Sequence, residues 1–144
     1  MSNMRKVAVK VAIPSWMTWF YGMVSLGLAP WIVYLLITLP ERRASIPWRA
    51  TWVVFDLALI IVSVTVTYFL HKRSLWAGLV LAALAALFAA DAWFDYMTSS
   101  LAADKTLAVV MDLCIELPLA VFSLWCAFYL FRQLTSLNMD KTSS

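Results

Sequence analysis

Residues 75–95 read LWAGLVLAALAALFAADAWFD, an alanine-rich apolar run that ends on two aspartates, Asp91 and Asp95. A helix needs about 20 predominantly apolar residues to cross the hydrocarbon core of a bilayer. Small residues allow helices to approach one another closely in lipid, so a helix with alanine on every face suits the centre of a bundle. The stretch therefore predicts a membrane-spanning helix over about 75–97, with two carboxylates in its last two turns.

Three further apolar runs lie on either side of this one, at about 17–39, 51–70 and 107–131, and polar segments separate them. The composition agrees, since 64% of the chain is hydrophobic and 13% is charged, against about 45–50% and 25% in soluble domains. The first run exceeds the 7–15 apolar residues of a signal peptide, so we expect it to be retained. We predict an all-α fold, a four-helix transmembrane bundle that forms one domain over residues 1–144.

The distribution of Lys and Arg predicts the orientation, because basic residues concentrate in cytoplasmic segments. If both termini share one side with the 72–75 loop, that side carries seven basic residues and the opposite side four. We therefore expect both termini in the cytoplasm and a multi-pass protein of the inner (plasma) membrane, whose surroundings are the lipid bilayer. We expect no nucleic-acid partner. The seven are Arg5, Lys6, Lys10, Lys72, Arg73, Arg132 and Lys141; the four are Arg42, Arg43, Arg49 and Lys105.

Five carboxylates fall inside the predicted helices, all in the outer half. Residues four apart share a helix face, so Asp91 pairs with Asp95 and Asp112 with Glu116, while Asp56 belongs to the second helix. Charged residues inside a membrane almost always face the bundle interior or a water-filled cavity. We predict that these five side chains form an acidic pocket open to the outside.

Further oxygen atoms are expected on the same helix faces. Ser63 and Thr67 follow Asp56 at seven and eleven residues, and Ser123 follows Glu116 at seven. Pro118 has no amide hydrogen, which frees the carbonyl of Cys114 in a continuous helix. We therefore expect these residues to support the pocket. Cys114 and Cys126 lie twelve residues apart on one predicted helix, which predicts no disulfide between them.

Carboxylates, hydroxyls and carbonyls suit a hard cation such as Ca²⁺, Mg²⁺, Mn²⁺ or Na⁺, with Asp91, Asp95, Asp112 and Glu116 as candidate metal ligands. Protons are the other candidate, because acid chains are common proton relays. The leading hypothesis is thus a small membrane protein that binds or conducts a cation or protons. As a channel or carrier it would need a homo-oligomer or a larger membrane complex, because four helices rarely enclose a path.

Two alternatives remain open. Arg49 and Lys105 could pair with the acids, and the chain would then be an accessory or scaffolding subunit whose helices are held by salt bridges. The third hypothesis is a metal-dependent membrane enzyme that acts on a lipid headgroup, although the sequence contains no Gly-rich phosphate loop, HExxH, GxSxG or CxxC motif.

The stretches DAWFDYMTS and ELPLAVFSLW resemble those of small, uncharacterised four-helix bacterial membrane proteins. The resemblance implies a compact four-helix fold and carries no activity with it.

Overall fold

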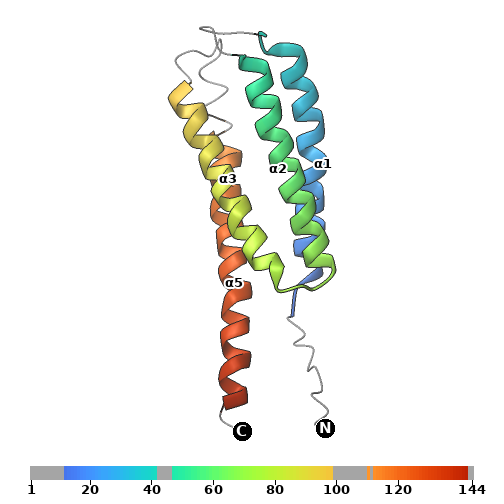
Figure 1. Cartoon of the computed structure of the whole chain (residues 1–144), viewed down its shortest axis with the longest axis vertical. Helices are drawn as coiled ribbons and strands as arrows, with labels where there is room; N and C mark the ends of the chain where they lie inside the picture. Colours follow the sequence, from blue (N-terminus) through green and yellow to red (C-terminus); the bar gives the residue numbers. More distant parts are fainter. Residues whose placement is uncertain (1–11, 42–46, 99–109, 111, 143–144) are drawn as a thin grey trace, which may run out of the picture.

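The computed structural model describes residues 12–41, 47–98, 110 and 112–142. Its elements are α1 (Ser15–Thr38), α2 (Trp48–His71), α3 (Trp76–Thr98), a π-helical turn η2 (Asp112–Glu116) and α5 (Leu117–Thr142). The helices run up and down, so that the start of α1, the α2–α3 turn and the end of α5 lie at one end of the molecule (Figure 1). We call this the termini end and the other the loop end.

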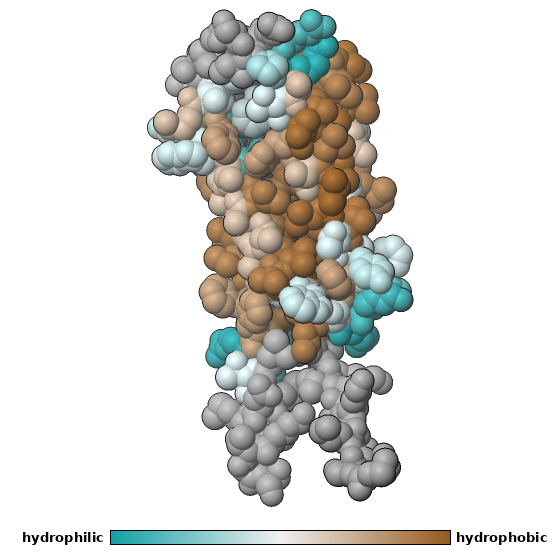
Figure 2. Space-filling model, viewed as in Figure 1, coloured by the Kyte–Doolittle hydropathy of each residue, from teal (hydrophilic) through white to brown (hydrophobic). Residues whose placement is uncertain are grey.

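The prediction of four apolar helices long enough to cross a membrane is confirmed. The four spans are Ser15–Thr38, Trp48–His71, Trp76–Thr98 and Leu113–Gln133. Figure 2 shows hydrophobic residues over the middle of the visible face and more hydrophilic residues toward both ends. Large apolar side chains such as Trp19, Leu26 and Val121 are exposed on the outer faces of the helices, which suits contact with lipid better than contact with water.

The ends of the helices follow from local chemistry. α1 and α2 each begin directly after a proline, Pro14 and Pro47, where the missing amide hydrogen costs little because the first amides of a helix have no intrahelical partner. α2 ends in a Schellman motif, in which the amides of Arg73 and Ser74 donate to the carbonyls of Leu70 (3.0 Å) and Phe69 (2.9 Å). Arg73 holds the left-handed conformation there, with φ 51°.

The helices pack as two pairs, α1 with α2 and α3 with α5, and contacts between α2 and α3 join the pairs. Long side chains also bridge α1 and α5: the Phe20 and Phe122 rings meet edge to face with centroids 4.9 Å apart. Gln133 ties the segment before α1 to α5, since it accepts from the Ala12 amide (3.1 Å) and donates to the Ala12 carbonyl (3.2 Å). α3 is the most buried of the four spans and α1 the least.

The fourth helix differs in shape from a single α-helix over 107–131. A π-turn, Asp112–Glu116, precedes the α-helical part, and α5 continues to Thr142. Residues 107–109 and 111 lie outside the described residues. Pro118 consequently sits in the first turn of α5 rather than in the middle of a helix. A proline is tolerated in a first turn, and the wider π-turn before it changes which carbonyls need a donor.

Candidate functional site

Three of the five predicted carboxylates are buried inside the bundle. The exposed fraction is 2% for Asp56, 6% for Asp91 and 9% for Glu116. They come from three different elements, α2, α3 and η2. Burying even one ionised carboxylate in an apolar medium is costly unless it is paired, so three in one bundle require a compensating interaction.

The register of the helices puts Asp56 and Asp91 at the same depth. α2 ends at His71 and α3 begins at Trp76, and fifteen residues counted from these ends lead to Asp56 and Asp91 respectively. The contact between the Phe55 and Phe94 rings, with centroids 6.3 Å apart, agrees with this antiparallel register.

The packing of α3 on α5 brings Glu116 to nearly the same level. Phe131 packs on Gly78, where an added Cβ would lie 3.3 Å from the ring. Thirteen residues up α3 from Gly78 lead to Asp91, and thirteen residues back along α5 from Phe131 lead to Pro118. Glu116 is two residues farther, which is about 3 Å at the rise of a helix. Asp56, Asp91 and Glu116 therefore lie at similar depth along the bundle, and we call this level the carboxyl layer.

The hydrogen bonding of the buried Asp56 carboxyl group is incomplete. The side chain of Trp31 on α1 lies close enough to interact with the Asp56 carboxyl, to which its indole N–H is the group able to donate because Trp has no acceptor. One oxygen of the Asp56 carboxyl, Oδ2, is buried with no hydrogen-bond partner among the residues that the structure describes. An unmade bond at a buried polar atom costs about 1–3 kcal/mol, so this oxygen is a place where a bound species would be stabilised.

The remaining predicted acids lie at the edge of the layer. Asp95 is half-buried, one helical turn nearer the loop end than Asp91. The backbone of Asp112 belongs to η2, but its side chain lies outside what the structure describes. Among the described side chains, no group of three or more His, Cys, Asp or Glu is arranged to hold a metal, and the metal set that includes Asp112 stays a prediction.

The two basic residues of the salt-bridge alternative lie elsewhere or outside the described residues. The Nε of Arg49 donates to the carbonyl of Leu39 (2.8 Å), and its Nη1 lies 3.9 Å from Oε1 of Glu41. Both partners belong to the chain that leaves α1, so the guanidinium is directed to the loop end. Lys105 is outside the described residues.

A second group of polar side chains lies about 10 Å deeper, two helical turns from the carboxyl layer. The Tyr21 hydroxyl of α1 donates to Oγ of Ser123 on α5 (3.0 Å), and this bond is buried. The thiol of Cys126 also interacts with the Tyr21 hydroxyl. Ser63 is fully buried, and its Oγ has no hydrogen-bond partner within the described parts of the chain.

Some of the predicted supporting residues are buried inside the bundle, and others are exposed on its surface. Ser63 and Ser123 do lie buried, on the faces that carry Asp56 and Glu116. The Thr67 hydroxyl donates to the Ser63 carbonyl (2.9 Å) within its own helix. Cys114 is exposed on the outside of η2, and Pro118 is exposed next to it. The contribution of Cys114 to a site would have to come from its backbone carbonyl, as the sequence predicted, and not from its thiol.

Toward the termini end the core is wholly apolar. Its side chains join one hydrophobic cluster and are nearly inaccessible to solvent. We call the carboxyl layer and the Tyr21, Ser63 and Ser123 group together the polar column. No fully buried polar side chain among the described residues continues it toward that end; the half-buried Thr67, one turn beyond Ser63, donates its hydroxyl within its own helix. The apolar core residues at that end are Met17, Leu70, Ala77, Leu81 and Leu130.

Sequence reasoning missed Trp31 and Tyr21, the α1 residues that reach the polar column. Both stand in an apolar run without charges, where aromatic residues are ordinarily read as lipid-facing or core. The available signal was that Tyr and Trp carry a hydrogen-bonding group that needs a partner when buried.

A scan against known protein-family models finds no match, and neither the curated proteins nor the solved structures contain a matching protein.

Proposed function

We propose that this chain is a small multi-pass membrane protein that binds a cation or protons at the carboxyl layer, with Asp95 and Asp112 at the outer edge of the site. The observation that supports the proposal best is the burial of Asp56, Asp91 and Glu116 at one depth on three helices. Ionisable residues within a membrane indicate a functional site by default, and ion pathways and proton relays are among the roles they mark.

Electrostatics explains why such a layer binds positive charge. Like charges in a medium of low dielectric constant repel strongly, so carboxyl groups gathered at one level of a bundle attract positive charge, whether from a cation, from protons or from a basic side chain. Arg49 is occupied by Glu41 and by a backbone carbonyl. A hard cation ligated by oxygen atoms, or protons shared among the carboxyl groups, removes the repulsion.

The charge distribution supports a site that faces the outside. With the termini, the 72–75 turn and the end of α5 on one side, the seven-to-four bias of Lys and Arg puts the termini end in the cytoplasm. The carboxyl layer lies nearer the loop end, which would then face the exterior of the inner (plasma) membrane.

The apolar core below the polar column bears on whether the site conducts. Within the described residues, a single copy in this conformation has no fully buried polar side chain between Ser123 and the termini end. The proposal is therefore a binding site closed on the cytoplasmic side. Conduction would require a rearrangement or a pathway built by a homo-oligomer or a larger complex.

The test is the melting temperature of the purified protein in detergent, with millimolar Ca²⁺, Mg²⁺, Mn²⁺ or Na⁺ and across pH. A ligand that binds only the folded state stabilises it by RT ln(1 + [L]/Kd), about 2.7 kcal/mol at a concentration of 100 Kd. If protons occupy the layer, the melting temperature rises as pH falls, because the folded state then holds more protons than the unfolded state. Asp56→Asn and Asp91→Asn should reduce this response without destabilising the ligand-free protein.

Glu41→Gln is the matched control, because it removes an exposed carboxylate at the loop end and should keep the wild-type response. The contrary result is a wild type indifferent to every ion and to pH, with both Asn variants less stable by about 3–5 kcal/mol. That loss is the cost of stranding the partner of a buried ion pair, and it would establish the scaffolding alternative instead.

A further inference from the structure

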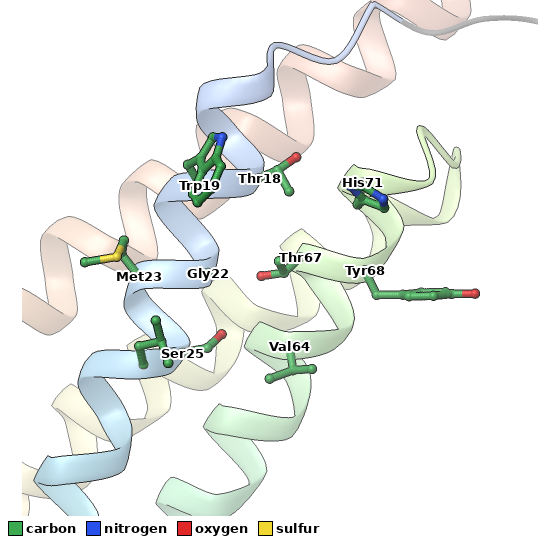
Figure 3. Close-up of a pocket in the computed structure, with 10 residues that line it drawn as sticks. Thr18, Trp19, Gly22, Met23, Ser25, Val64, Thr67, Tyr68 and His71 are labelled. Atoms are coloured by element: carbon green, nitrogen blue, oxygen red, sulfur yellow. The ribbon is translucent and has the colours of Figure 1, made fainter.

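A groove on the outer surface lies between α1 and α2, away from the carboxyl layer. It encloses about 530 Å³ and extends from Thr18 to Leu26 on α1 and from Val64 to His71 on α2. Small-molecule sites in proteins span about 300–1,000 Å³. Figure 3 shows Trp19 and Met23 on one side of the groove and Val64 and Tyr68 on the other.

The floor of the groove is apolar although three of its residues carry polar groups or lack a side chain. Gly22 leaves an opening in which an added Cβ would stand 3.8 Å from Cγ2 of Thr67. The hydroxyls of Ser25 and Thr67 donate to the carbonyls of Tyr21 (2.8 Å) and Ser63 (2.9 Å) within their own helices. Because both hydroxyls are bonded within their own helices, neither needs a partner in the groove, whose lining is almost entirely apolar and suits a hydrocarbon chain.

A basic turn adjoins one end of the groove. His71 lines the groove at the termini end, and Lys72 follows His71 directly, with its ammonium 5.8 Å from the centroid of the Tyr68 ring, which extends away from α1 (Figure 3). Arg73 follows in the same turn and is exposed. The groove thus combines an apolar channel about 12 Å long, given eight residues of α1 at 1.5 Å each, with basic residues at its termini end.

We infer that this groove binds one anionic phospholipid of the leaflet on the termini side, with an acyl chain between α1 and α2 and its phosphate at Lys72 and His71. Charge complementarity selects this occupant, because basic pockets between membrane helices bind anionic headgroups. A second transmembrane helix would extend well beyond a groove of this length, and a free phosphate ion would make no use of its apolar floor. The inference does not depend on the carboxyl layer.

The experiment measures lipid binding to the full chain in detergent by native mass spectrometry. Phosphatidylglycerol and phosphatidylcholine with identical acyl chains are titrated separately. We expect the wild type to bind phosphatidylglycerol at least about fivefold more tightly, the factor that one basic residue near an anionic headgroup supplies. Lys72→Gln should reduce this preference about fivefold. Arg132→Gln, which removes an exposed charge on α5 outside the groove, should leave it unchanged.

Gly22→Leu fills the groove and should weaken the binding of both lipids, whereas Gly27→Leu, on the same helix where an added Cβ meets no atom within 4 Å, should not. Glycerol 3-phosphate, which has the phosphate without the chains, should not compete. Equal affinity for the two lipids in the wild type would overturn the inference. So would the same loss of preference in Lys72→Gln and Arg132→Gln, or effective competition by glycerol 3-phosphate. If Gly22→Leu fails to fold, the comparison of Lys72→Gln with Arg132→Gln tests the inference by itself.

Discussion

At the scale of single residues, the buried bond from Tyr21 to Ser123 is the clearest polar contact between α1 and α5. The two oxygens are 3.0 Å apart, and both side chains are fully buried. Because the backbones of α1 and α5 do not approach each other as α1 and α2 do, long side chains such as Tyr21 and Phe20 make this contact. The hydroxyl pair should therefore contribute to holding the two helix pairs together.

We predict that a double-mutant cycle of Tyr21→Phe and Ser123→Ala yields a coupling free energy of about 0.6 kcal/mol, the average for side-chain hydrogen bonds in membrane proteins. The free energy of unfolding in mixed micelles is the quantity to measure. Thr65→Ala serves as the control, because its hydroxyl donates to the Ile61 carbonyl within α2 (2.7 Å) and should show no coupling to Tyr21→Phe. A coupling of zero would mean that the Tyr21 hydroxyl is equally well satisfied by Cys126.

At the scale of elements, the glycines mark two different helix contacts. The Cβ position of Gly78 on α3 lies 3.3 Å from the Phe131 ring, tighter than ordinary packing, whereas that of Gly22 on α1 lies 3.8 Å from Thr67, an ordinary contact. The α3–α5 contact thus depends on the absence of a side chain, and the α1–α2 contact does not. Since the α3–α5 register also sets the depth of Glu116, Gly78 matters to the carboxyl layer.

Gly78→Ala should be less stable than Gly22→Ala, because the Phe131 ring must shift by a few tenths of an ångström to admit the methyl group, and overpacking costs about 1–3 kcal/mol where a neighbour cannot move. Gly22→Ala and Gly27→Ala should be neutral or stabilising by up to about 1 kcal/mol, because alanine favours a helix over glycine. Unfolding in mixed micelles measures all three variants. Phe131→Leu, combined with Gly78→Ala, should recover part of the loss. If Gly78→Ala proved as stable as Gly22→Ala, Phe131 would not fix the α3–α5 register.

At the scale of the whole molecule, acidic and basic residues lie toward opposite ends. The carboxyl layer lies toward the loop end, the groove between α1 and α2 lies toward the termini end, and the apolar core lies between the polar column and that end. Basic residues show the opposite bias to acids along the chain. Such a bias of basic residues toward one end favours a single orientation in a membrane.

We predict that a cysteine at Glu41 reacts with a membrane-impermeant thiol reagent on intact cells and that one at Ser74 does not. Both variants are built on a chain in which Cys114, exposed on the outside of η2, is replaced by Ser. The expectation follows from seven basic residues on one side against four on the other. Permeabilised cells should label both positions. Labelling of Ser74 alone in intact cells would turn the carboxyl layer toward the cytoplasm.

The sequence alone determined that the chain forms four apolar helices and which stretches form them. These are local properties, since the length of an apolar run and the polar segments between runs are read directly from composition. The residues that would be costly in lipid, Asp56, Asp91 and Glu116, were identified for the same reason, because the cost of a carboxylate in hydrocarbon does not depend on the fold around it.

The tertiary structure decided which of these residues meet. Helices that are hydrophobic on every face carry no amphipathic signal to show which side is buried, so the sequence left open that Asp91 is buried while Asp95 is half-buried. The partners Trp31 and Tyr21, the π-turn before Pro118 and the groove at Gly22 depend on the rotation and register of neighbouring helices. Those are set by close contacts such as Phe131 on Gly78, which arise only when helices distant in the sequence pack together.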